Sequence, residues 1–137
     1  MPDLLSTIMR WLHISSMAAL VGGLLYARLA MLPAIQALAP DAREMLGERA
    51  AAAFRPLAFA AMAGAAISGF YNMLTSPGHS ARYHTLLGIK LLLAAHLFAA
   101  TILIVRPHCR RRARLMAGAL ISGLAIVLIA AYMKRIF

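Results

Sequence analysis

The chain has one cysteine and few charged residues. Cys109 has no second cysteine with which to form a disulfide or a paired-cysteine metal site. Charged residues make up 13% of the 137 positions, which is about half of their share in soluble domains. This composition excludes a disulfide-stabilised scaffold, which needs many cysteines, and a disordered chain, which needs many polar residues.

Apolar residues fill most of the sequence. They account for 63% of the chain, and the mean hydropathy is +0.79. A membrane-spanning helix needs about 20 consecutive, mostly apolar residues, and four segments satisfy this requirement: 5–31, 56–76, 85–105 and 115–133. We therefore predict an all-α fold, an integral membrane up-down-up-down four-helix bundle, in which residues 1–137 form one transmembrane domain in a lipid bilayer.

Positive charge is concentrated in the connections between the apolar segments. The formal net charge is +10, but because the basic residues flank apolar runs, we expect no nucleic-acid partner. Residues 106–114 contain five arginines and no acidic residue. The positive-inside rule places this connection in the cytoplasm and both termini outside. The excess of arginine over lysine is typical of a GC-rich bacterial genome, so we expect the bacterial inner membrane.

Two connections carry local structural signals. Asp41, with Glu44 three residues later, predicts a helix start, and we expect a short interfacial helix on the cytoplasmic side before the chain enters the membrane at Pro56. The segment 76–80 contains Pro77-Gly78 and predicts a tight turn. The second and third spans would then form an antiparallel hairpin.

Small residues recur four positions apart in two spans. Gly64 and Ser68 share a face of the second span, and Gly118 and Ser122 share a face of the fourth. Such faces allow close helix packing, which is how helices associate in lipid. The packing could lie within the bundle, between copies in a homo-oligomer, or against a larger membrane complex. A flat wall of small residues could also leave room for a planar cofactor.

Three ionisable side chains fall inside predicted spans. Placing His13, Lys90 or His96 in hydrocarbon is costly, by roughly 2.5–3.5 kcal/mol for a lysine, so such residues usually serve function. All three lie in the outer half to the middle of the bilayer. Lys90 and His96 are separated by about 120° around their helix, so they do not share a face. The predicted spans contain no acidic residue, which argues against a carboxylate proton relay.

These residues support two functional interpretations and a structural one. His13 and His96 could ligate a haem iron across the bundle, with Lys90 pairing with a propionate or replacing one ligand. Alternatively, Met9, His13 and Met17 form a ladder with one residue per helical turn that suits Cu(I). The structural interpretation is that the methionines pack and the histidines hydrogen-bond between helices. A fourth possibility is a non-catalytic accessory subunit.

Six short segments are typical of a group of known membrane proteins: Trp11-Leu12-His13, residues 22–28, Leu32-Pro33-Ala34, Phe54-Arg55-Pro56, Ser68-Gly69 and Gly88-Ile89-Lys90-Leu91. Through these segments most of the chain, residues 10–106, resembles the copper-resistance D (CopD) family and the related HemJ-type membrane oxidases of protoporphyrinogen. The CopD resemblance implies a four-helix bundle and copper transport. The HemJ-type resemblance implies an oxidoreductase that binds haem b through residues corresponding to His13 and Lys90, although Gly88 stands where those proteins usually have a histidine.

Overall fold

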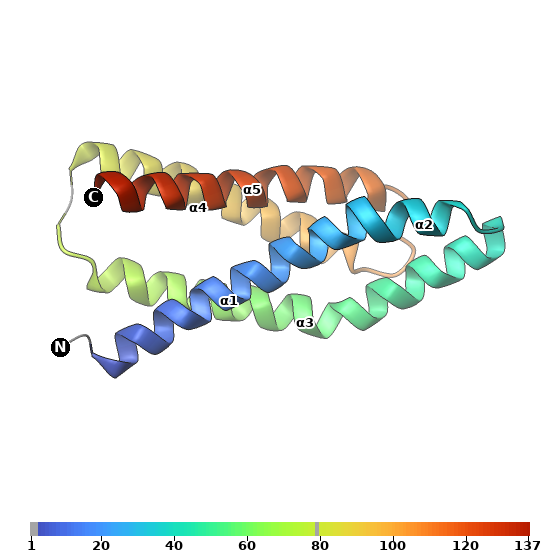
Figure 1. The fold of residues 1–137 in the computed structure, drawn as a ribbon, viewed down its shortest axis with the longest axis horizontal. Coiled ribbons are helices and arrows are strands. Elements are labelled where there is room, and N and C mark those ends of the chain that lie inside the picture. Colours follow the sequence, from blue (N-terminus) through green and yellow to red (C-terminus); the bar gives the residue numbers. More distant parts are fainter. Residues whose placement is uncertain (1–2, 79) are drawn as a thin grey trace.

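A computed structural model describes residues 3–78 and 80–137, and these residues form helices and short connections without any strand (Figure 1). Four helical segments within this range are long and apolar enough to cross a membrane, which confirms that the four apolar segments form long helices. The first of them, Leu4–Gln36, is continuous and has a π-helical turn near its end. The elements are α1 (Leu4–Tyr26), η1 (Ala27–Met31), α2 (Leu32–Gln36), α3 (Pro40–Thr75), α4 (Ala81–Ile104) and α5 (Arg112–Ile136).

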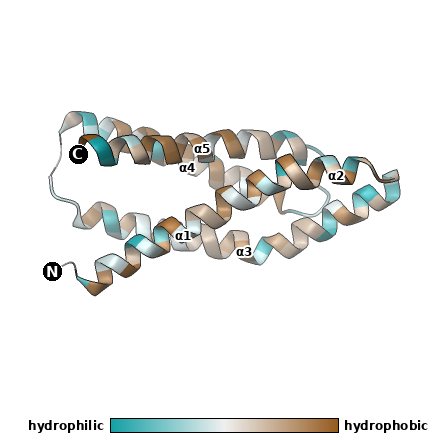
Figure 2. Cartoon of the chain, in the orientation of Figure 1, coloured by the Kyte–Doolittle hydropathy of each residue, from teal (hydrophilic) through white to brown (hydrophobic). Residues whose placement is uncertain are grey.

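The outer surface of the helices is apolar. Leu92, Ile121 and Leu128 are each more than two-thirds exposed, at 75%, 69% and 71%. Figure 2 shows hydrophobic residues along the long helices and hydrophilic residues gathered towards their ends. A surface with this many exposed large aliphatic side chains is unfavourable in water and favourable against lipid.

The prediction of a separate, short interfacial helix is wrong. The segment from Pro40 belongs to α3, which continues without a break through Pro56 to Thr75. The predicted cap is also wrong, because Ala39 is the N-cap, Pro40 occupies the first turn and no side chain caps the helix. The alanines at 50–53 favour helix strongly. Pro56 removes one backbone hydrogen bond, a loss that apolar helices commonly tolerate.

The four long helices form two pairs. α1 packs mainly against α3, and α4 packs mainly against α5. α3 and α4 make few contacts with each other, so the predicted hairpin is not a closely packed pair. The predicted turn between them includes His79, which lies outside the described residues.

The pairs meet in a core displaced towards one end of the molecule. The α2–α3 and α4–α5 connections lie at this end, here called the arginine-rich end, and the termini lie at the other, the terminal end (Figure 1). Core residues come from the parts of the helices nearer the arginine-rich end, and they include Leu20, Leu24, Ala58, Met62, Leu97, Ala100, Ile104, Met116 and Ala119. Towards the terminal end the two pairs diverge.

Close helix packing depends on small residues, as predicted. A Cβ atom added at Gly64 on α3 would collide with the Ser16 hydroxyl of α1. At Gly123 on α5 the added atom would lie 2.9 Å from a methyl carbon of Val21 on α1. The Gly64 face therefore holds α1 against α3, and Gly123 holds α1 against the second pair.

Candidate functional site

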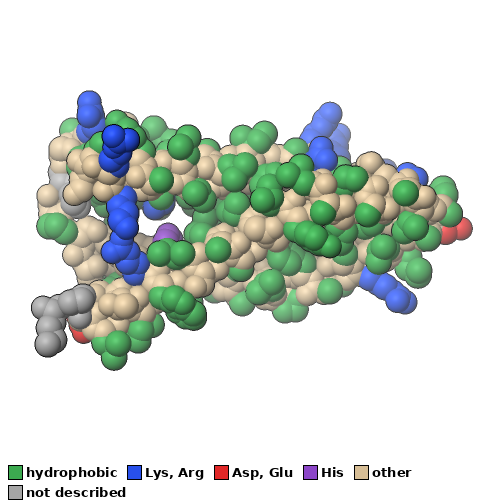
Figure 3. Space-filling view, viewed as in Figure 1, with side chains coloured by type: hydrophobic (Ala, Val, Ile, Leu, Met, Phe, Trp, Pro, Cys, Tyr) green, Lys and Arg blue, Asp and Glu red, His purple; other side chains and the backbone are tan. Residues whose placement is uncertain are grey.

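The divergence of the two helix pairs leaves a cavity of about 520 Å³ at the terminal end, here called the terminal cavity. Figure 3 shows the molecule open between the pairs near the termini, with a histidine side chain at the edge of the opening and basic side chains beside it. His13 on α1 and Lys90 on α4 both line this cavity. The structure therefore brings together two of the three ionisable residues singled out in the sequence.

Hydrogen bonds to α3 fix the orientation of the His13 ring. Its Nδ1 atom lies 3.1 Å from the carbonyl oxygen of Ala65 and 3.1 Å from the hydroxyl oxygen of Ser68. A carbonyl oxygen only accepts, so Nδ1 carries the proton and donates it. The Ser68 hydroxyl donates to the carbonyl of Gly64, which leaves its oxygen free to accept from Nδ1.

This arrangement determines what Nε2 can do. With the proton on Nδ1, Nε2 of the neutral ring presents a lone pair. Among the described residues Nε2 makes no hydrogen bond. A histidine whose Nδ1–H is held by a backbone carbonyl, with Nε2 free, has the usual arrangement of a metal-ligating histidine.

Small residues on α3 make space for the ring. A Cβ atom at Gly69 would lie 3.2 Å from Cε1 and 3.4 Å from Nδ1 of His13, tighter than an ordinary contact. Ala65, Ala66 and Gly69 all line the cavity. The predicted wall of small residues therefore exists on α3, and His13 lies against it.

The remaining lining is mostly apolar with a few polar groups. Lys90 is half-buried and shares the cavity with three polar residues that the sequence analysis missed: Asn72, Ser76 and Tyr83. A signal for two of them was present, since Ser68, Asn72 and Ser76 recur every four residues along α3 and its C-cap. The apolar lining includes Met17, Phe70, Met73, Leu87, Phe98 and Ile126.

His96 lies apart from this cavity. Its Nδ1 is 2.7 Å from the Ser122 hydroxyl of α5, and the ring lies next to Gly118. The residue is exposed on the surface of the α4–α5 pair. Lys90 faces the cavity from the same helix, so the angular separation of about 120° turns His96 away. The expected meeting of His13 and His96 does not occur in the structure.

The predicted methionine ladder is also divided. Met17 lines the terminal cavity with His13, whereas Met9 does not, and Met73 of α3 contributes a second thioether instead. Within residues 3–78 and 80–137, no group of three or more histidine, cysteine or acidic side chains is placed to hold a metal ion. A site here would therefore combine one imidazole with thioethers or with a cofactor that brings its own ligands.

Comparison of the chain with protein-family models, with curated proteins and with solved structures finds no match.

Proposed function

We propose that this protein binds haem b in the terminal cavity and acts in membrane-bound electron transfer or oxidation. One observation carries the proposal: His13 donates its Nδ1 proton to α3 and keeps Nε2 free, in the same cavity as the Lys90 ammonium group. The resemblance to HemJ-type proteins points to the same two residues. His96, expected as a second ligand, has no part in this site.

The residues around the cavity suit a haem. The volume of the terminal cavity is about 520 Å³. This falls within the usual range for cofactor sites, about 300–1,000 Å³. A haem requires one or two ligands from side chains, and His13 would provide one. Lys90 would pair with a propionate or provide the second ligand. A bound haem would supply one-electron exchange between ferric and ferrous iron.

The chain's own residues would have three tasks. His13 would bind the haem iron. The carbonyl of Ala65 and the hydroxyl of Ser68 hold the His13 ring in position for this. Apolar side chains such as Leu87 and Phe98, which line the cavity, would contact the haem ring and exclude water from its faces. Exclusion of water strengthens the electrostatic attraction between Lys90 and an anionic group.

The proposal includes a location in the membrane. The arginine-rich end would face the cytoplasm of a bacterial inner membrane, following the positive-inside rule. The terminal cavity would then lie in the outer half of the bilayer, open towards the outer surface. Electrons would be exchanged on that side.

The direct test is the absorption spectrum of protein purified from haem-replete cells. The wild type is expected to show a Soret band, His13→Ala to lose it, and His96→Ala to keep it because that ring lies outside the cavity. A colourless wild type, or a Soret band that survives in His13→Ala, would contradict the proposal. Secondary structure measured by circular dichroism checks that each variant folds.

A Cu(I) site is the second candidate, favoured by the two thioethers beside His13. Met17 and Met73 line the cavity from facing helices, and thioether with imidazole suits a soft cation. This alternative predicts that Met17→Leu weakens Cu(I) binding while Met9→Leu, outside the cavity, does not. Equal Cu(I) affinity in wild type and Met17→Leu would eliminate it.

A further inference from the structure

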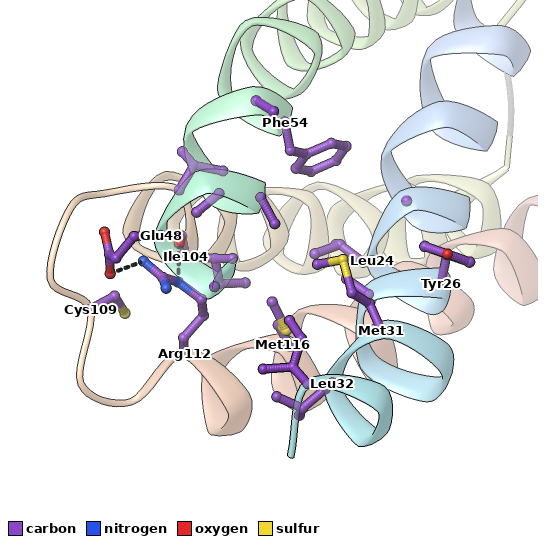
Figure 4. Close-up of a pocket in the computed structure, with 18 of the residues that line it drawn as sticks. Leu24, Tyr26, Met31, Leu32, Glu48, Phe54, Ile104, Cys109, Arg112 and Met116 are labelled. Carbon is purple, nitrogen blue, oxygen red and sulfur yellow. Dashed lines mark hydrogen bonds and ion pairs between the residues drawn. The ribbon is translucent and has the colours of Figure 1, made fainter. Parts of the chain in front are cut away.

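A second, larger cavity of about 1160 Å³ lies at the arginine-rich end, here called the basic cavity. It is lined by the end of α1 with η1 and α2, by the first half of α3, and by the α4–α5 connection with the adjoining ends of these two helices (Figure 4). It is larger than most small-molecule sites, whose volumes reach about 1,000 Å³. The proposed redox function makes no use of it.

One wall of the basic cavity is apolar and comes from several helices. Figure 4 shows Leu24, Met31, Phe54, Ile104 and Met116 around a common hollow. Such a wall fits hydrocarbon, and it lies where the apolar helices reach the end of the molecule. A ligand here therefore needs an apolar part.

The opposite wall carries charge, part of which is already used. Arg112 is 3.0 Å from the Glu48 carboxylate and donates from Nε to the carbonyl of Ile104. Outside the lining, Arg55 donates to the carbonyl of Val105. These two arginines cap the C-terminal carbonyls of α4 and hold the connection in place.

The remaining charge is free to meet a ligand. Arg43 and Arg110 also line the cavity. So does Glu44, whose carboxylate forms no ion pair with an arginine within the described residues. Arg43 uses one nitrogen to donate to the carbonyls of Gln36 and Leu38. Arg110 is exposed and makes no hydrogen bond in the part of the chain that the structure describes. The arginines of residues 106–114 extend this basic surface outward.

We propose that the basic cavity binds an anionic phospholipid, with a hydrocarbon chain along the apolar wall and the phosphate at Arg110. Basic pockets between transmembrane helices on the cytoplasmic side characteristically hold acidic lipid headgroups. A lipid satisfies both walls at once, whereas a soluble anion leaves the apolar wall exposed. The bilayer that surrounds the helices supplies the ligand.

The test is native mass spectrometry of the full chain in detergent with added phosphatidylglycerol or phosphatidylcholine of identical chains. The wild type is expected to retain phosphatidylglycerol preferentially. Arg110→Gln is expected to reduce this retention about tenfold or more, the effect of losing one hydrogen bond between charged groups. Arg111→Gln is the matched control, since Arg111 is adjacent to Arg110 in the chain but does not line the cavity.

A second pair of variants tests the apolar wall without changing charge. Ala53 lines the cavity and the adjacent Ala52 does not. Ala53→Trp is expected to displace both lipids, and Ala52→Trp to displace neither. Circular dichroism of all four variants confirms that the chain is folded.

Three results would overturn the proposal. Equal retention of the two lipids would show that the phosphate site has no preference for anionic headgroups. Equal losses in Arg110→Gln and Arg111→Gln would indicate general attraction to the basic surface. Displacement of phosphatidylglycerol by millimolar inorganic phosphate would show that an anion binds without the hydrocarbon chain.

Discussion

The two cavities lie between the same helices and differ in how their polar atoms are used. In the terminal cavity a single imidazole has its Nδ1 satisfied by α3, and Nε2 is left for a ligand. In the basic cavity the cations are numerous, but Arg112 is occupied by Glu48 and by a helix terminus. The first arrangement presents a nitrogen base, and the second presents residual positive charge.

This contrast shows how similar packing can produce two kinds of site. Small residues bring α1 onto α3 at Gly64, and the core joins the two pairs nearer the arginine-rich end. Beyond the core the pairs diverge and space opens. A few polar atoms in each space then determine which ligand chemistry it can hold.

Removal of the cation should have the largest effect on the terminal cavity. Lys90→Met keeps a long side chain but loses the charge that would pair with a propionate. Hydrogen bonds to charged groups contribute about 1.5–3 kcal/mol, so haem affinity should fall roughly 10- to 150-fold. Spectroscopic titration of the apoprotein with haem measures this change.

Lys134→Met is the control, because Lys134 is exposed at the terminal end and lies outside the lining. A similar loss in both variants would show that overall charge, and not the cavity, governs binding.

The packing that supports the cavity wall is tested by Gly64→Val. The added side chain would collide with Ser16 and push α1 from α3. Overpacking of this kind costs about 1–3 kcal/mol. We expect a lower midpoint of thermal unfolding in detergent, followed by circular dichroism.

Gly88→Val introduces the same residue into α4 at a position with nothing within 4 Å of the added Cβ. It should unfold close to the wild-type temperature. If the two variants were equally destabilised, helix propensity and not the contact with α1 would be the cause.

A smaller effect is expected when His13 loses one of its two hydrogen-bond partners. In Ser68→Ala the carbonyl of Ala65 still accepts from Nδ1. A typical hydrogen bond contributes about 0.5–1.5 kcal/mol, so haem should bind up to roughly tenfold more weakly, measured by the same titration. Ser122→Ala, which affects only the partner of His96, should leave haem affinity unchanged. The reverse order of effects would move the site to the α4–α5 surface.

The smallest effect is expected at the arginine-rich end. Glu48→Gln removes the charge that pairs with Arg112 and accepts from the His108 backbone N–H. The pair is partly exposed, with 15% and 29% of the two side chains accessible, and such pairs contribute about 1 kcal/mol or less. Tryptic cleavage at Arg110 and Arg111 should become a few-fold faster.

Glu44→Gln is the comparison variant, because Glu44 makes no ion pair in the described structure. Its cleavage rate should match the wild type. Haem binding at the terminal cavity should be unaffected by both variants, and a change there would show that the two ends are coupled.

The sequence predicts the four long apolar helices well. It predicts less well which of these helices pack against each other. The four spans follow from long apolar runs, which leave little alternative to helix. The continuity of α3 through Pro56 was missed although the alanines at 50–53 favour helix, and no local pattern indicates the π-helical turn at Ala27–Met31. The choice of α1 with α3, and of α4 with α5, depends on how helices pack, which no local pattern records.

The candidate site was predictable in part. The cost of burying His13 and Lys90 identified both residues, but their presence in one cavity depends on two helices far apart in sequence. The helical angle between Lys90 and His96 already indicated that the two face different directions. The hydrogen bond from His13 to the carbonyl of Ala65 could not be predicted, since every backbone carbonyl is an equal candidate in the sequence.

The most direct test of the account is chemical rescue of His13. His13→Gly removes the imidazole and leaves space for a free one beside Gly69. In protein prepared with haem, we predict that the variant lacks the wild-type Soret band and regains it when imidazole is added. A wild-type Soret band in the variant before imidazole is added would show that another residue holds the haem and would contradict the assignment.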